Sequence, residues 1–276
     1  SLEPTVQAFA ENILDQYELD WHPQDSGIVI LNPKNGEIIA LAARPAFDPN
    51  NLADADPAAF SNPITEKVYE FGSIMKPITM AAALDSGAVT PETTYTDLGY
   101  AIYDDSRINN YDFKGRGPGT TMQDVLSQSL NTGVAFAVEQ MGTDVFREYL
   151  DRFAIREETG IDLPNEVAPL AANLESPRMI EYATASFGQG IAITPIAMAR
   201  ALGTLANHGE VPGPHIATRL EYPGGYSKEL GWTPERQAIS KDASETLTRM
   251  LVEVVDTALR NGTVKIPELS VAAKTG

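Results

Sequence analysis

The chain has 276 residues, with 38 acidic and 20 basic side chains and a formal net charge of −18. This acidic balance leaves no basic patch to neutralise phosphates, which argues against nucleic acid and an anionic membrane surface as partners. The absence of cysteine excludes disulfides, thiolate catalysis and cysteine-ligated metals, and the three histidines are scattered. We therefore expect no metal and no cofactor, and a length suited to one large domain or two small ones.

The N-terminal part of the chain is expected to form a helix followed by a β-hairpin. Apolar residues recur at helical spacing at the start, at Val6, Phe9, Ala10, Ile13, Leu14 and Tyr17. Two β-rich runs follow, 27–31 and 37–41, with Asn35-Gly36 between them as a strong hairpin signal. We find no signal peptide and no apolar run long enough to span a bilayer, and expect a membrane anchor upstream of Ser1.

The middle of the chain is predicted to be mostly helical. A helix is expected over 73–85, where Pro77 is tolerable because a first-turn N–H has no partner to lose. A second is expected over 121–128, with Thr121 and Asp124 resembling a capping box. Further helices are predicted to begin at Thr143 and at Thr194-Pro195.

The C-terminal part is predicted to contain a core helix and then a strand. The clearest apolar stripe of the chain spans residues 247–259 and is expected to face the core. Residues 269–273 have the composition of a strand that leads into Lys274. Strands near both chain ends predict an α+β fold of the α-β sandwich kind, with an antiparallel sheet built from both ends and flanked by helices. The sheet subdomain would cover about 1–60 and 263–276, and a mostly helical subdomain about 61–262.

Three short motifs occur once each, in a fixed order: Ser73-Ile74-Met75-Lys76, Ser129-Leu130-Asn131 and Lys274-Thr275-Gly276. A serine hydroxyl is a poor nucleophile until a base removes its proton. Ser73 and Lys76 lie three apart, so one helix face would bring the amine within reach of the hydroxyl. To act as a base, Lys76 needs a pKa lowered from ~10.4 to about 7–8. Burial and a nearby cation, for which Lys274 is the candidate, would lower it.

The other two motifs supply polar groups that could hold a substrate. In an extended loop, Ser129 and Asn131 would point to the same side, one relaying protons and the other holding a carbonyl or amide. Lys274 and Thr275 offer a cation and a hydroxyl for a carboxylate. Gly276 would let a substrate backbone lie close to the chain.

Two other patterns carry less weight. Ser73 lacks the G-x-S-x-G elbow, which argues against a Ser-His-Asp hydrolase. The segment Gly188-Gln189-Gly190 has no preceding β-run to support phosphate binding, and we interpret it as a turn before the helix at Thr194.

The motifs and their surroundings resemble the transpeptidase domain of class B, high-molecular-mass penicillin-binding proteins, which share their fold with serine β-lactamases. The resemblance covers nearly the whole chain, and its other landmarks are 31–38, 69–77, 159–164 and 187–195. It implies a peptidoglycan D,D-transpeptidase that is inhibited by β-lactams. Phe71 stands where the family usually has proline, which we interpret as a local packing change.

The resemblance implies a role for each motif residue. Ser73 would attack the D-Ala-D-Ala carbonyl of a stem peptide, Lys76 would take its proton, and Ser129 would help to protonate the leaving group. Asn131 would orient the substrate, while Lys274, Thr275 and Gly276 would bind it. The family's second oxyanion donor is the N–H of the residue after this motif, and its remaining strands and closing helix follow. We therefore expect a fold that is incomplete at the C-terminus, in a chain that can be inactive as given.

The resemblance also implies partners and a location. The expected partners are lipid-linked peptidoglycan precursor, β-lactam antibiotics, a glycosyltransferase, and membrane proteins of division or elongation. The expected place is the outer face of the cytoplasmic membrane. Two alternatives remain: a serine β-lactamase or D,D-carboxypeptidase, and a non-catalytic β-lactam sensor or division scaffold. Glu166 could serve as a deacylating base in a β-lactamase, but its sequence context favours a loop role.

Overall fold

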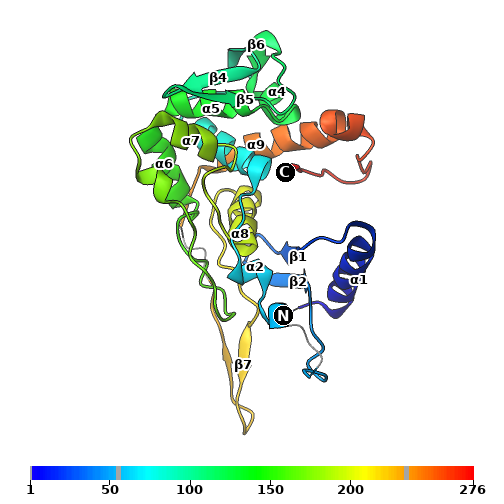
Figure 1. Ribbon diagram of the computed structural model, residues 1–276. Coiled ribbons are helices and arrows are strands. Elements are labelled where there is room, and N and C mark those ends of the chain that lie inside the picture. The colour runs from blue at the N-terminus through cyan, green and yellow to red at the C-terminus, as the bar shows by residue number, and fades with distance from the viewer. Residues whose placement is uncertain (1, 54–56, 233–235) are drawn as a thin grey trace.

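The computed structural model describes residues 2–53, 57–232 and 236–276 (Figure 1). In chain order the helices and strands are α1 (Pro4–Trp21), β1 (Ser26–Leu31), β2 (Ile38–Arg44), α2 (Pro63–Glu66), α3 (Lys76–Asp85), β3 (Thr94–Asp97), β4 (Tyr100–Tyr103), β5 (Ser106–Asn109), β6 (Gly117–Thr121), α4 (Met122–Ser127), α5 (Asn131–Met141), α6 (Thr143–Arg152), α7 (Met179–Ala185), α8 (Pro195–Ala206), β7 (Arg219–Glu221), β8 (Ser227–Glu229) and α9 (Lys241–Glu253). Shorter helical turns are η1 (Pro57–Phe60), η2 (Gly72–Met75), η3 (Ala172–Glu175), the π-helical η4 (Val254–Ala258) and η5 (Leu259–Gly262).

The predicted N-terminal hairpin is present. Strands β1 and β2 pair antiparallel, from Ser26 opposite Arg44 to Leu31 opposite Ile38. The connection turns at Gly36, whose φ of +81° favours glycine. A Cβ at this position would also lie 2.0 Å from the Gly213 carbonyl oxygen, so only glycine fits here.

The predicted first helix is also present, but its buried face is narrower than the sequence suggested. Helix α1 packs on β2 through Ala10 and Leu14, which are buried. Phe9, Ile13 and Tyr17 are 67%, 41% and 48% exposed, so only part of the apolar face of this helix is buried. The hairpin covers one side of the helix, whereas the six apolar residues span a wider arc of its circumference.

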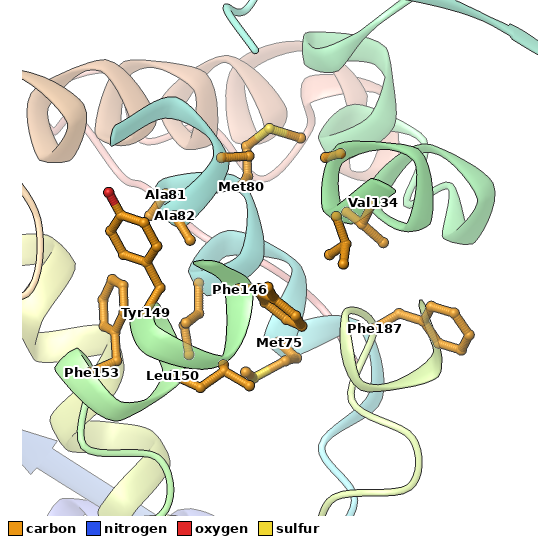
Figure 2. Packing of buried hydrophobic residues seen from close by; sticks show 14 of the residues in the cluster. Met75, Met80, Ala81, Ala82, Val134, Phe146, Tyr149, Leu150, Phe153 and Phe187 are labelled. Atoms are coloured by element: carbon orange, nitrogen blue, oxygen red, sulfur yellow. The ribbon is translucent and has the colours of Figure 1, made fainter. Parts of the chain in front are cut away.

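The main hydrophobic core is built around α3, which contacts α5, α8 and α9. Figure 2 shows Met75 and Met80 among the side chains of this core, with Phe146, Leu150 and Phe153 from the α6 region nearby. The predicted apolar stripe of α9 contributes Leu247, Met250 and Leu251, and it continues into η4. Burial of these residues fixes η2 and the start of α3, which together carry the first motif. The helix predicted over 73–85 thus begins with a 3₁₀ turn, and its α-helical part starts at Lys76.

The helix starts predicted from caps are confirmed. Thr121 and Asp124 form a capping box at the start of α4, and the Thr194 side chain accepts from the Ala197 N–H ahead of α8. The region predicted as mostly helical also contains strands, because β3 pairs with β6 and β4 with β5 in separate two-stranded sheets. Among the described residues, no helix is long and apolar enough to cross a lipid bilayer.

The expected sheet built from both chain ends is not formed. Residues 269–273 have no strand hydrogen bonding, and β1 and β2 form a two-stranded sheet. A strand is defined by its hydrogen-bonded ladder with a neighbour, and none of the described strands pairs with this segment. The C-terminal end lies instead near α9 and the start of α3, away from the N-terminal hairpin (Figure 1).

Candidate active site

Ser73 lies in the η2 turn, directly before α3, and a neighbouring segment holds this turn in place. Tyr69 and Ile193 exchange two backbone hydrogen bonds of 2.9 and 3.1 Å. The Gly72 N–H donates to the Gly188 carbonyl at 3.3 Å. A Cβ on Gly188 would lie 2.4 Å from the Gly72 carbonyl oxygen, so the two backbones can approach this closely only with glycine.

Lys76 is fully buried at the first position of α3. Its Nζ donates to the carbonyl oxygen of Ser129 at 2.5 Å and to Ser129 Oγ at 3.1 Å. Burial, together with the positive charge of Lys274, lowers the pKa of Lys76 to about 7. This pKa matches the requirement derived from the sequence, so a substantial fraction of Lys76 is neutral at pH 7.

The second motif has a different backbone from the one expected. Ser129 is left-handed, with φ of +55°, Leu130 is extended, and Asn131 begins α5. The prediction of an extended loop was therefore wrong. The turn nevertheless brings Ser129 and Asn131 to the same cleft, because it reverses the chain between α4 and α5. The side-chain amide of Asn131 donates to the Asn109 carbonyl at 2.9 Å.

The third motif approaches Ser129 from the other side. Lys274 Nζ donates to Ser129 Oγ at 2.9 Å and to the carbonyl of Thr275 at 2.8 Å. Burial lowers the pKa of Lys274 to about 8. Lys274 is half-buried, while Thr275 and Gly276 are exposed at the cleft. Ser129 Oγ is thus the meeting point of two lysines from distant parts of the chain.

A cleft of about 460 Å³ joins these groups. All seven residues singled out from the sequence are brought together, since five of them line the cleft and two contact Ser129: Ser73, Ser129, Asn131, Thr275, Gly276, Lys76 and Lys274. The arrangement combines a hydroxyl, an amine of lowered pKa, a second hydroxyl and a cation. Such a set can carry out nucleophilic acyl transfer on a substrate that bears a carboxylate.

Sequence reasoning missed four larger side chains that line the cleft: Tyr111, Gln128, Phe187 and Gln189. The turn predicted at 188–190 is present, with positive φ at both glycines. Its second role was not foreseen, because Gln189 lines the cleft and Gly188 supports the turn that holds Ser73. A G-x-G turn without a phosphate-binding context could have suggested such close backbone packing.

Two residues that raised questions in the sequence have structural roles. The Glu166 carboxylate accepts the N–H groups of Thr159 and Gly160 at 2.7 and 2.9 Å, which agrees with the preferred loop role. Among the described residues that line the cleft, Glu166 does not occur. Phe71 packs against the main core and meets the Tyr69 ring edge-on.

Comparison with known proteins gives the family to which this chain belongs. Residues 26–276 match the family described as the penicillin binding protein transpeptidase domain. The match covers most of the chain, and the chain therefore belongs to this family.

Several relatives and solved structures agree. The chain is 32% identical over 259 residues to stage V sporulation protein D of Bacillus subtilis, covering 92% of this chain and 40% of that protein. It is 28% identical over 225 residues to peptidoglycan D,D-transpeptidase FtsI of Escherichia coli, covering 81% of this chain and 37% of that protein. Penicillin binding protein 3 of Mycobacterium tuberculosis, in complex with aztreonam, has the same mixed α/β fold, with a TM-score of 0.86. The two sequences are 23% identical, and the match covers 92% of this chain and 57% of that chain. The chain thus spans about two fifths of the length of stage V sporulation protein D and of FtsI.

Proposed function

We propose that this protein is a peptidoglycan D,D-transpeptidase that works through an acyl-enzyme on Ser73. The single observation that carries the proposal is the fully buried Lys76, whose Nζ lies 3.1 Å from Ser129 Oγ, behind the cleft that Ser73 and Ser129 line. Membership of the transpeptidase family supplies the chemistry to which these groups are suited.

The first step is attack by Ser73 Oγ on the penultimate D-Ala carbonyl of a stem peptide. Neutral Lys76 has two N–H groups, and two hydrogen bonds to Ser129 can occupy both, which leaves the nitrogen lone pair for the Ser73 proton. The Ser73 Oγ–carbon bond forms as that proton moves to Lys76. A tetrahedral intermediate results, and the N–H groups at the start of α3 favour its negative charge.

The second step expels the terminal D-alanine. Ser129 Oγ accepts hydrogen bonds from Lys76 and Lys274, so its own hydrogen can be directed at the leaving nitrogen. The carbon–nitrogen bond breaks, Ser129 gives its proton to the leaving amine, and Lys76 returns a proton to Ser129. An amine of a neighbouring stem peptide then attacks the ester along the reverse route, and Ser73 regains its hydrogen.

The remaining predicted residues would bind the substrate. The Lys274 cation and the Thr275 hydroxyl are suited to the terminal carboxylate, because a charged donor beside a hydroxyl forms strong hydrogen bonds to it. Asn131 would orient the peptide from the opposite wall, and Gly276 leaves room for the peptide backbone. A β-lactam, whose ring carbonyl and carboxylate imitate the dipeptide, would acylate Ser73 in the same way.

Covalent labelling tests the proposal. The protein is treated with a fluorescent penicillin, intact-mass analysis reports the number of labels, and mass spectrometry of the proteolysed protein reports the labelled residue. We expect one label on Ser73 and none in Ser73→Ala. Persistent labelling of that variant at an equal rate would remove Ser73 from its proposed role.

Two other functions are tested by the same reaction. A serine β-lactamase or D,D-carboxypeptidase would release the acyl group quickly to water, and Glu166 is the candidate base for that step. Its hydrogen bonds to Thr159 and Gly160 favour the transpeptidase instead. Rapid turnover of a chromogenic β-lactam would reverse this preference. Binding of a β-lactam or a partner protein without any acyl-enzyme would instead indicate a sensor or scaffold.

The setting of the reaction is also a proposal. We infer that the protein acts at the outer face of the cytoplasmic membrane, on lipid-linked precursor and stem peptides. Its partners there would be a glycosyltransferase and membrane proteins of division or elongation. The name of one relative, a peptidoglycan D,D-transpeptidase, supports the peptidoglycan substrate, while the location and the protein partners follow from the resemblance to class B penicillin-binding proteins. We further propose that the chain forms one transpeptidase domain, with 61–262 as a mostly helical subdomain and 1–60 with 263–276 as the second one, although these two segments share no sheet within the described residues. Its support is that the cleft is lined by residues of 61–262 together with Thr275 and Gly276.

A further inference from the structure

The turn that carries Ser129 has an energetically unfavourable backbone. A left-handed conformation is costly for residues other than glycine and persists only where the surroundings impose it. The φ of +55° at Ser129 aims its carbonyl at Lys76, where the 2.5 Å hydrogen bond forms. What imposes this conformation therefore also positions the proposed base.

Three anchors hold the residues on either side of Ser129, and all come from the segment 97–116. The Arg116 guanidinium donates from Nε to Gln128 Oε1 at 2.9 Å. On the other side, the Asn131 amide donates to the Asn109 carbonyl at 2.9 Å. The third anchor is Thr132, which follows Asn131 in the first turn of α5 and contacts Asn110 and Asp97.

Asp97 is the centre of the network behind these anchors. It lies at the end of β3 and is 1% exposed. Its carboxylate accepts hydrogen bonds from the Gly99 N–H, the Asn110 side-chain amide, the Arg116 N–H and the Thr132 hydroxyl, at 2.9 to 3.1 Å. Asn110 in turn accepts the Thr132 N–H at 3.2 Å.

Every group that contacts the Asp97 carboxylate in this network is a hydrogen-bond donor, so both side-chain oxygens at position 97 must accept. The Tyr95 hydroxyl lies 2.9 Å from Thr132 Oγ1 and can donate to it, so Thr132 can donate onward to Asp97. The Asn110 amide and the Arg116 N–H are donors as well. An amide at position 97 would turn one acceptor into a donor and leave buried N–H groups facing each other, which is costly.

We propose that Asp97 is a positioning residue for Ser129: through Asn110, Arg116 and Thr132 it holds the 128–132 segment in the left-handed turn that presents Ser129 to both lysines. Asp97 touches no substrate in this proposal. The inference rests on the proposed function for its effect on rate, while its effect on the turn is independent of any reaction.

The first test measures the turn itself by hydrogen exchange. In Asp97→Asn we expect amides of the peptide 126–133 to exchange at least about tenfold faster, because the N–H groups of Ser129 and Leu130 close this turn. Amides of α3 should be unchanged. Unaltered exchange over 126–133 would overturn the proposal, whether or not the protein reacts with β-lactams.

The second test measures acylation of Ser73 by a fluorescent penicillin. We expect Asp97→Asn to slow it by about 10–100-fold, the usual effect of displacing a reacting group by a fraction of an ångström to 1 Å. Thr132→Val should slow it also, whereas Thr132→Ser, which keeps the hydroxyl, should remain near the wild-type rate. Equal rates in the Val and Ser variants would contradict the route through Thr132.

A double-mutant cycle separates positioning from general stability. If Asp97 acts through Ser129, Asp97→Asn combined with Ser129→Ala should be no slower than Ser129→Ala alone. Multiplicative losses would refute the proposal. The control is Asp85→Asn, since Asp85 is a part-buried aspartate outside the cleft that likewise accepts from a hydroxyl and a backbone N–H, those of Tyr149 and Ser240. It should lower the melting temperature without changing the acylation rate of the folded protein. Failure of the wild type to label would count against the proposed function, and the exchange experiment would still decide the role of Asp97.

Discussion

Two lysines from different regions donate to the same hydroxyl, and their surroundings give them different chemistry. Lys76 starts a helix at the centre of the main core and is fully buried, and its pKa is about 7. Lys274 lies in a segment without strand pairing, is half-buried, and has a pKa of about 8. Near neutral pH, the more buried lysine is therefore more often neutral and available to accept a proton, and the less buried one is more often charged. The comparison teaches that a difference in burial, reinforced at Lys76 by the charge of Lys274, can divide two identical side chains between proton transfer and anion binding.

The strongest test of this division is removal of the proposed base. Lys76→Met keeps most of the buried volume but has no proton acceptor. We expect acylation of Ser73 to fall by about 10²–10⁴-fold, the usual contribution of a general base, measured as the second-order rate constant with a fluorescent penicillin. A loss below tenfold would transfer the role of base to another group.

Stability at different pH values provides the control for this variant. The folded pKa of Lys76 is about 7 and the unfolded one ~10.4, so the unfolded chain binds the extra proton between these values. The free energy of unfolding of the wild type should therefore rise with pH from about 7 to 10. In Lys76→Met this part of the rise should be missing, and the variant should be at least as stable as the wild type at pH 7.

A second test displaces the nucleophile without touching either lysine. In Gly188→Ala, the new Cβ would lie 2.4 Å from the Gly72 carbonyl oxygen, and the residue would keep a positive φ of 78°. The turn that holds Ser73 must then move, and we expect acylation to fall by about 10²-fold. The matched control is Gly87→Ala, at a positive φ but with open space around the Cβ. A similar loss in both variants would show that backbone strain, not the contact with Gly72, is responsible.

A third test examines the cation. Lys274→Gln removes the charge proposed to bind the carboxylate, and we expect roughly a tenfold loss in the second-order rate constant, with most of the change in binding. Lys274→Arg keeps the charge and should lose less. The expected order reverses if Lys274 acts mainly as an acid or base, because the guanidinium cannot give up its proton at these pH values.

The smallest expected effect is on the pH dependence of acylation. The rate should rise with pH through about 7 as Lys76 loses its proton, and fall above about 8 as Lys274 loses its charge. Since the Lys274 charge helps to lower the Lys76 pKa, the acidic limb should move to slightly higher pH in Lys274→Gln. In Lys274→Arg the alkaline limb should extend. An acidic limb that is identical in all three proteins would mean that the two lysines do not interact.

The sequence determined the local chemistry and the local turns. The three motifs identified the residues that meet at Ser129, and the capping pairs at Thr121 and Thr194 gave helix starts, because a cap depends on neighbours only a few residues away. The Asn35-Gly36 signal gave the first hairpin for the same reason. The requirement for a neutral lysine also indicated that burial and a nearby cation would lower the pKa of Lys76.

Only the tertiary structure decided which surfaces are covered and how distant segments meet. The outward half of α1, the unpaired backbone of 269–273 and the left-handed Ser129 all depend on neighbours far away in the chain. The same holds for Gly188 against Gly72 and for Asp97 behind Thr132, each a contact between residues more than 30 positions apart. Local patterns describe what a segment can do by itself, whereas burial and backbone strain are set by the segments that pack against it.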